Sequence, residues 1–82
     1  MSFNSNRRKV LNESLPFGIR ASHARSCALN VATKLSVNRE AVNTEVYNMT
    51  GVSLHAPADS AALLQAFTYL NDLRNGRATL NV

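Results

Sequence analysis

The sequence predicts an all-α protein, a small bundle of three to four helices. Apolar residues recur three or four positions apart over several long stretches, which is the helical period. Asparagine, aspartate, proline and glycine bracket those stretches where helices begin and end. No stretch alternates apolar and polar residues for long enough to predict a strand. We therefore expect residues 1–82 to form a single small helical domain, with flexible ends at 1–6 and 77–82.

The N-terminal half predicts two helices separated by a break. Ser5 is a suitable N-cap for a short helix over 6–13. Pro16 and Gly18 interrupt any continuation, so residues 14–20 are expected to form a connection that holds at most a helical turn. The second helix is expected from about 21 or 22 to 35. Its alanines form a ridge of small side chains on which another helix can pack closely, at positions 21, 24, 28 and 32.

The longest helix is expected over 57–75. Pro57 suits its first turn, Asp59 complements the positive end of the helix dipole, and Gly76 ends it. The broadest apolar face of the chain lies on this helix and comprises Leu63, Leu64, Phe67, Leu70 and Leu73. We expect most of that face to close the core. An 82-residue domain buries little surface alone, so part of this helix is also a candidate for pairing in a homodimer.

A helix-turn-helix is the most informative pattern, at about 22–50. The third helix is expected over 39–50, capped by Asn38 and ended by Gly51. Only a very short turn separates it from the second helix, and Val37 is placed to fill the corner. The small and apolar inner positions that the motif needs are Ala32, Val42 and Val46. Any helical hairpin with a short turn gives a similar pattern, so a purely structural interpretation stays open.

Charge is distributed unevenly along the chain. The formal net charge is +4. Residues 1–39 hold seven basic residues and one acidic residue, a net of +6, whereas residues 40–82 hold two basic and four acidic residues, a net of −2. A basic half favours contact with phosphates or with another acidic partner, although it is also compatible with a simple solvated surface.

These patterns predict a small non-enzymatic protein that binds double-stranded DNA as a homodimer and regulates transcription. The third helix would enter the major groove, where asparagine pairs with adenine and arginine with guanine. The candidate contacts on that helix are Arg39, Asn43, Thr44, Tyr47 and Asn48, and the candidate phosphate contacts elsewhere are Arg7, Arg8, Lys9, Arg25 and Lys34. We expect Arg7, Arg8 and Lys9 to act as a basic arm.

The alternative is a helical adaptor or inhibitor that docks an acidic surface of a larger protein partner. Glu40 and Glu45 lie on the predicted recognition helix, and carboxylates repel phosphate. Replacing both by glutamine should strengthen DNA binding if that helix enters the groove. The same change should leave duplex affinity unchanged, or absent, if the surface serves a protein.

Catalysis and metal binding are not expected. His23 and Cys27 stand four apart on one helix, but zinc needs three or four ligands and only His55 and scattered carboxylates remain. The three glycines are too far apart for a phosphate loop, and the five acidic residues are too scattered for a carboxylate pair. We predict no cofactor. The single cysteine excludes an internal disulfide and no apolar run approaches a membrane span, so a cytoplasmic protein is expected.

Overall fold

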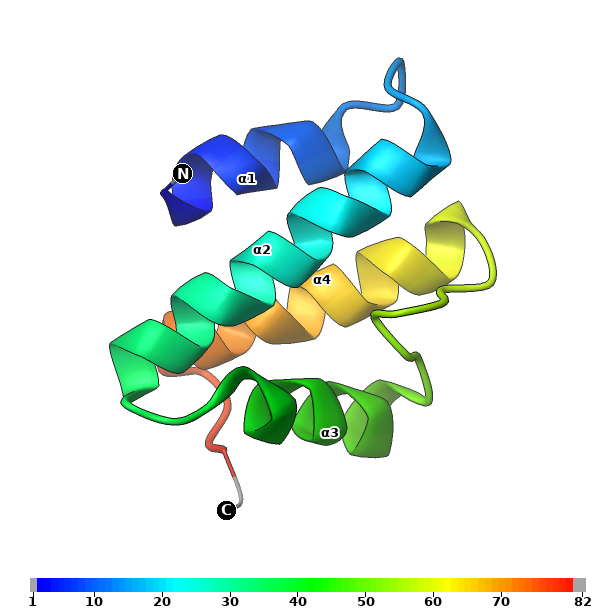
Figure 1. Cartoon of the computed structure of the whole chain (residues 1–82). Helices are drawn as coiled ribbons and strands as arrows, with labels where there is room; N and C mark the ends of the chain where they lie inside the picture. The colour runs from blue at the N-terminus through cyan, green and yellow to red at the C-terminus, as the bar shows by residue number, and fades with distance from the viewer. Residues whose placement is uncertain (1, 81–82) are drawn as a thin grey trace.

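The computed structural model describes residues 2–80 and confirms the all-α fold class (Figure 1). Its four helices are α1 (Phe3–Leu11), α2 (Phe17–Leu35), α3 (Arg39–Thr50) and α4 (Ser60–Arg74). No strand occurs in the part of the chain that the structure describes. No helix there is long and apolar enough to cross a membrane.

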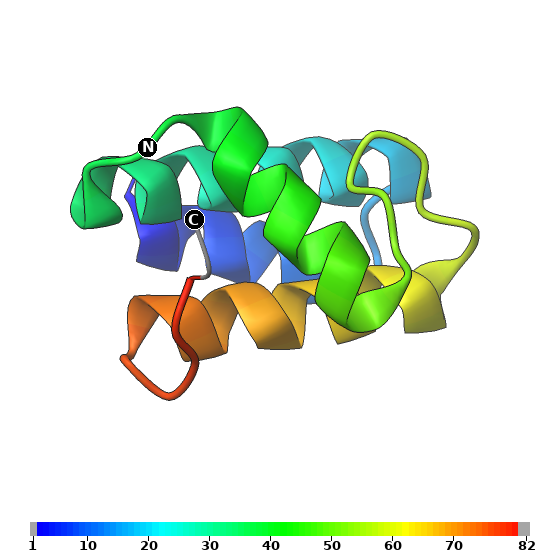
Figure 2. The ribbon, with the colours of Figure 1, turned by 90° about the horizontal axis from the view of Figure 1, so that it is seen from below.

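The long helix α2 lies at the centre of the bundle and contacts the other three helices. The neighbouring α4 runs in the same direction as α2, and α1 runs in the opposite direction along one side of that pair (Figure 1). On the other side, α3 crosses the pair obliquely, as Figure 2 shows from below. Because α1 and α3 lie on opposite sides, they do not contact one another.

The predicted ridge of small side chains on α2 lies in the core. Ala24, Cys27 and Ala28 are completely buried, and Ala21 and Ala32 are nearly so. Larger side chains from the other helices pack around this ridge, among them Val10, Val42, Val46, Leu63, Leu70 and Leu73. Small residues on the central helix therefore let three neighbours approach it at once.

The first helix begins earlier than predicted. It starts at Phe3 and ends at Leu11, and the Oγ of Ser2, instead of Ser5, caps it by accepting a hydrogen bond from the Ser5 N–H at 3.2 Å. Phe3 is buried and stacks on Phe67 with ring centroids 5.9 Å apart. This distant contact stabilises the additional turn, which the local sequence did not indicate.

The second helix also begins earlier, because Pro16 starts it instead of breaking it. The carbonyl of Pro16 accepts the N–H of Arg20 at 3.1 Å, so the expected connection over 14–20 is helical from Phe17. Arg20 is buried and ties three helices together. Its Nε donates to the Val10 carbonyl at 2.8 Å and its Nη1 to the Ser60 Oγ at 3.1 Å.

The fourth helix begins three residues later than predicted. Asp59 is its N-cap instead of a first-turn residue, because its Oδ1 accepts the N–H of Ala62 at 2.8 Å. Pro57 consequently lies in the connection. After the helix, residues 77–80 form no regular structure, and Ala78 and Leu80 pack against the core. The end that was predicted to be flexible, 77–82, includes residues 81 and 82, which lie outside the described residues.

The turn between α2 and α3 is short, as predicted, and α3 has the predicted bounds. Asn38 caps α3 by accepting the Ala41 N–H at 2.9 Å, and Gly51 follows with φ of 74°. Ser36 adopts the left-handed conformation with φ of 58°, and the N–H of Val37 reaches the Ala32 carbonyl at 3.0 Å. This is a Schellman motif with serine in the position that glycine usually occupies.

A buried polar contact sets the rotation of α3 about its own axis. Glu45 is 5% exposed, and its Oε2 accepts a hydrogen bond of 2.8 Å from the Tyr69 hydroxyl on α4. Glu45 therefore faces the bundle, and not the outer surface of α3 where it would repel phosphate as the sequence suggested. Burial, this hydrogen bond, and the charges of Glu45 and Asp72 raise the pKa of Tyr69 to about 12.

Replacing Ser36 by glycine should stabilise the protein by about 0.5–1 kcal/mol. The left-handed conformation costs a non-glycine residue roughly 1–2 kcal/mol, and S36G removes that cost from the folded state. Glycine also loses more conformational entropy on folding than serine does, so the net gain in stability is smaller than that cost. Urea unfolding of S36G measures the difference. The control is S26G within α2, which should destabilise the protein by about 0.5–1 kcal/mol. Equal destabilisation by the two changes would contradict the turn geometry.

Replacing Tyr69 by phenylalanine should destabilise the protein by about 1–3 kcal/mol, because it leaves a buried carboxylate oxygen without its donor. The matched control is Tyr47→Phe, whose side chain is 57% exposed, and which should change stability by less than about 0.5 kcal/mol. Urea unfolding near neutral pH measures both variants. Similar losses in the two variants would show that the Glu45–Tyr69 bond does not stabilise α3.

The same pair predicts a loss of stability at alkaline pH. Folding raises the pKa of Tyr69 from 10.0 to about 12, so the folded state favours the protonated phenol. Its contribution to stability is complete below about pH 10 and declines as the pH rises toward 12. Unfolding measured across that range should show a smaller alkaline loss in Y69F than in the wild type. Identical profiles of stability against pH in Y69F and the wild type would contradict a raised pKa of Tyr69 in the folded state.

Candidate functional site

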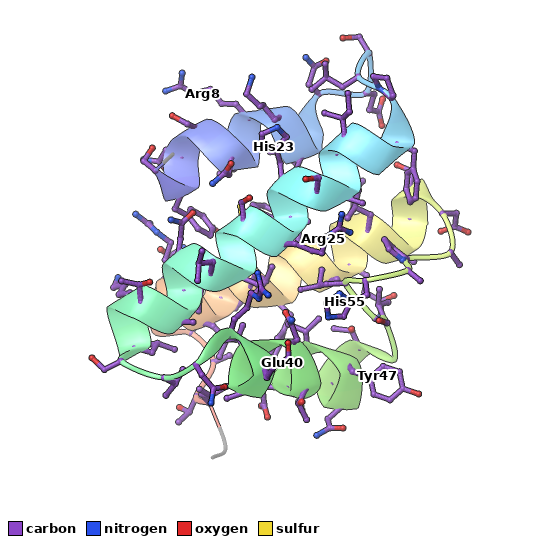
Figure 3. All side chains as sticks on the ribbon, in the orientation of Figure 1. Arg8, His23, Arg25, Glu40, Tyr47 and His55 are labelled. Atoms are coloured by element: carbon purple, nitrogen blue, oxygen red, sulfur yellow. The ribbon has the colours of Figure 1, made fainter. Side chains whose placement is uncertain are left out.

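A stripe of exposed side chains runs along the outer side of α3. It comprises Glu40, Thr44, Tyr47 and Asn48, which we call the α3 stripe. Their spacing follows the helical period, while Val42 and Val46 on the inner side are completely buried. Tyr47 is 57% exposed and extends away from the bundle in Figure 3. Three of the predicted α3 contacts, Thr44, Tyr47 and Asn48, therefore share one solvent-facing surface.

The expectation that Asn43 faces outward is wrong. Its side chain is 8% exposed, and its Nδ2 lies 3.5 Å from the Nε2 of His55. The Oδ1 of Asn43 is buried and has no hydrogen-bond partner among residues 2–80. Asn43 lies three residues before Val46, on the edge of the inner face of α3, and its amide faces the connection after α3.

The structure brings two arginines and a histidine, from three segments, to one side of the α3 stripe. Arg25 of α2 is half-buried, and its Nη1 donates to the Leu54 carbonyl at 3.0 Å. Arg39 is the first residue of α3, and no hydrogen bond or ion pair engages its side chain within the described residues. His55 comes from the connection between α3 and α4 (Figure 3).

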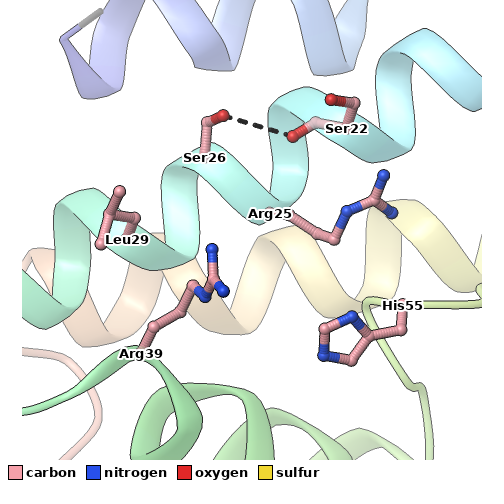
Figure 4. Close-up of a pocket in the computed structure, with 6 residues that line it drawn as sticks. All are labelled: Ser22, Arg25, Ser26, Leu29, Arg39 and His55. Atoms are coloured by element: carbon pink, nitrogen blue, oxygen red, sulfur yellow. Dashed lines mark hydrogen bonds between the residues drawn. The ribbon is translucent and has the colours of Figure 1, made fainter.

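These three side chains surround a hollow of about 320 Å³, which we call the cationic hollow (Figure 4). Its lining consists of Ser22, Arg25, Ser26, Leu29, Arg39 and His55. No carboxylate belongs to this lining. Because the lining is rich in hydrogen-bond donors and positive charge, it suits an anion.

A second, smaller hollow of about 250 Å³ adjoins the first, because His55 lines both. Its lining includes Glu40, Thr44 and Tyr47 of the α3 stripe, together with Asn43. The α3 stripe and the cationic hollow are therefore parts of one continuous face, to which α2, α3 and the connection after α3 contribute.

Sequence reasoning missed His55, Ser22 and Ser26 as members of this face. The two serines carried a weak signal, since they stand four apart on α2 beside Arg25. His55 carried none, because it lies in an irregular connection whose course depends on how α3 and α4 pack.

The remaining predicted phosphate contacts lie elsewhere. Arg7, Arg8 and Lys9 are on α1, which does not contact α3, so they form part of a helix instead of a basic arm near α3. Figure 3 shows Arg8 on the opposite side of the bundle from Glu40. The Nζ of Lys34 donates to the Arg74 carbonyl at 2.8 Å, where it neutralises the negative end of the α4 dipole.

The His23–Cys27 pair is not arranged as a metal site. The Nδ1 of His23 lies 2.9 Å from the Oδ1 of Asn6, and Cys27 is completely buried. Burial raises the pKa of the Cys27 thiol to about 12, although nearby Arg74 opposes the shift. A thiol protonated at neutral pH is a poor metal ligand. Among the described residues, no group of three or more histidine, cysteine, aspartate or glutamate side chains could hold a metal ion.

Comparison of the chain with protein-family models, with curated proteins and with solved structures found no match. The function must therefore be inferred from the chemistry of the α3 stripe and the cationic hollow, which together we call the α2–α3 face.

Proposed function

We propose that this protein binds double-stranded DNA through the face formed by α2 and α3, with α3 as the recognition helix, and that it regulates transcription. The observation that carries the proposal is the juxtaposition of an exposed polar stripe on α3 with the unneutralised cationic hollow beside its first turn. Base contacts need exposed polar groups on a helix that can enter a groove, and phosphate contacts need cations beside it.

The chemistry of the α3 stripe suits this role. Asn48 is exposed and can pair with adenine, and the hydroxyls of Thr44 and Tyr47 can donate to phosphate oxygens. Arg39 is exposed at the start of α3, where it borders the cationic hollow and can contact a phosphate beside the groove. The four side chains belong to one rigid element that is capped at both ends.

The electrostatic objection to DNA binding is weaker than the sequence suggests. Glu45 is bound to Tyr69 inside the bundle, so Glu40 is the only carboxylate of the α3 stripe. A single carboxylate at this position repels phosphate, or reads cytosine by accepting from its amino group. The α2–α3 face therefore offers two arginines against one glutamate.

A homodimer would place two copies of α3 on one duplex. One recognition helix of 12 residues contacts few base pairs, and twofold dimers of helix-turn-helix proteins read two half-sites about one helical turn apart. We include homodimer formation in the proposal for that reason.

A second candidate function is docking to an acidic protein partner. Exposed Leu29, Tyr47 and Met49 lie on the same two helices as the arginines and are 50%, 57% and 58% exposed. Tyrosine, methionine and arginine are enriched in protein interfaces. Under this function the α2–α3 face would bind carboxylates and apolar groups of the partner, and duplex DNA would not compete with it.

Binding to a random-sequence duplex, measured by fluorescence anisotropy across a salt series, tests the proposal. We expect tight binding at low salt that weakens steeply as salt increases, because each neutralised phosphate releases counterions. Glu40→Gln should strengthen binding about 2–5-fold, which corresponds to removing about 0.5–1 kcal/mol of repulsion near the phosphates. Asn48→Ala should weaken binding to a preferred site more than binding to random sequence.

The matched control is Glu13→Gln, which removes the same charge from an exposed position before α2. An equal effect of E13Q and E40Q would mean that net charge alone governs binding and would contradict the placement of α3 in the groove. Absence of duplex binding by the wild type at low salt would overturn the proposed function and favour a protein partner.

A further inference from the structure

We propose that the cationic hollow is a binding pocket for a single phosphate group, supplied either by the backbone of a nucleic acid or by a free phosphate. Where the source is duplex DNA, the inference rests on the proposed function. The pocket itself depends only on the arrangement of its lining residues and can exist without any DNA contact.

Arg25 is the fixed donor of this pocket. Its Nη1 donates to the carbonyl of Leu54 at 3.0 Å, and Leu54 is 1% exposed, so the anchor belongs to the core. The remaining N–H groups of this guanidinium have no protein acceptor among residues 2–80. A guanidinium that is held in place before binding loses little conformational entropy when an anion arrives.

Arg39 is the mobile donor. It is exposed at the beginning of α3 and has no hydrogen-bond or ion-pair partner in the described part of the chain. In Figure 4 the guanidinium of Arg39 and the imidazole of His55 border the same space as Arg25. Two cations that line one hollow without a carboxylate repel each other, and a bound anion removes that repulsion.

The serine hydroxyls and the His55 imidazole are further polar groups of the lining, in addition to the two guanidinium groups. Ser26 donates to the Ser22 carbonyl at 3.3 Å, whereas the hydroxyl of Ser22 has no partner among the described residues. Among the described residues, the one polar partner of the His55 ring is the Asn43 Nδ2, 3.5 Å from the His55 Nε2. The lining therefore offers several separate donors around one space, which fits an anion with several acceptor oxygens.

Charge favours a phosphate group over less charged ligands. The hollow of about 320 Å³ has room for one phosphate group. A phosphate offers more acceptor oxygens than a carboxylate, and arginine binds it in a bidentate manner. Glu40 lines the neighbouring hollow and not this one, so no carboxylate competes for the arginines.

NMR titration of the full chain with inorganic phosphate at constant ionic strength tests the pocket directly. We expect saturable shifts of the Arg25 and Arg39 side-chain Nε–H signals and of His55. Arg39→Gln should weaken phosphate binding at least about fivefold, as expected for the loss of a charge-assisted hydrogen-bond donor. The control is Arg77→Gln, which removes the same charge from an exposed position in the C-terminal tail.

Two results of the titration would overturn the pocket. One is a set of weak shifts spread evenly over all exposed arginines. The other is an equal loss of phosphate affinity in R39Q and R77Q, which would mean that net charge alone attracts the anion.

A salt series with duplex DNA then identifies the source of the phosphate. If the hollow binds a backbone phosphate, R39Q should lower the slope of log affinity against log salt by about 1, and R77Q should leave it unchanged. Specific phosphate binding with an unchanged duplex slope in R39Q would support a free phosphate as the ligand. Specific phosphate binding without any duplex binding would support the pocket and overturn the proposed function, so the two can fail separately.

Discussion

The narrow buried face of α2 is the constraint on which the rest of the structure depends. A helix that contacts three others needs small side chains where they cross it, and α2 presents Ala24, Cys27 and Ala28 there, completely buried. Small side chains contribute little apolar area, so the bulk of the core comes from elsewhere. Leu63, Leu70 and other large residues of α4 supply it.

Because the side chains that α2 contributes to the core are small and similar, polar contacts help to fix how the helices are oriented. Arg20 joins α1, α2 and the start of α4, and the hydrogen bond between Tyr69 and Glu45 joins α4 to α3. Buried polar groups need their partners, so a rotated or shifted helix would leave them unsatisfied. These contacts therefore favour the observed arrangement of the helices over rotated ones.

The rotation of α3 determines the properties of the candidate face. With Glu45 turned inward and Thr44 outward, the outer surface of α3 loses a carboxylate and keeps polar groups that can contact bases. The same rotation places Arg39 beside Arg25 and His55 around one hollow. The chemistry of the α2–α3 face therefore depends on how the inner side of α3 packs against the bundle.

Local patterns in the sequence are sufficient to predict the all-α fold class, both bounds of α3 and the short turn before it. These features depend on capping by Asn38 and Gly51 and on apolar spacing, which involve residues only a few positions apart. The predicted starts of α1, α2 and α4 were wrong, because several residues near each start can begin a helix. For α1 and α2, a distant contact accompanies the earlier start, as with Phe3 on Phe67.

The set of side chains that forms the candidate site depends on the tertiary structure. It buried Asn43, turned Glu45 toward Tyr69, separated Arg7, Arg8 and Lys9 from α3, and brought His55 to the arginines. The helical period gives the relative directions of side chains on one helix. The absolute rotation of that helix, and the course of an irregular connection, depend on contacts between residues far apart in the chain.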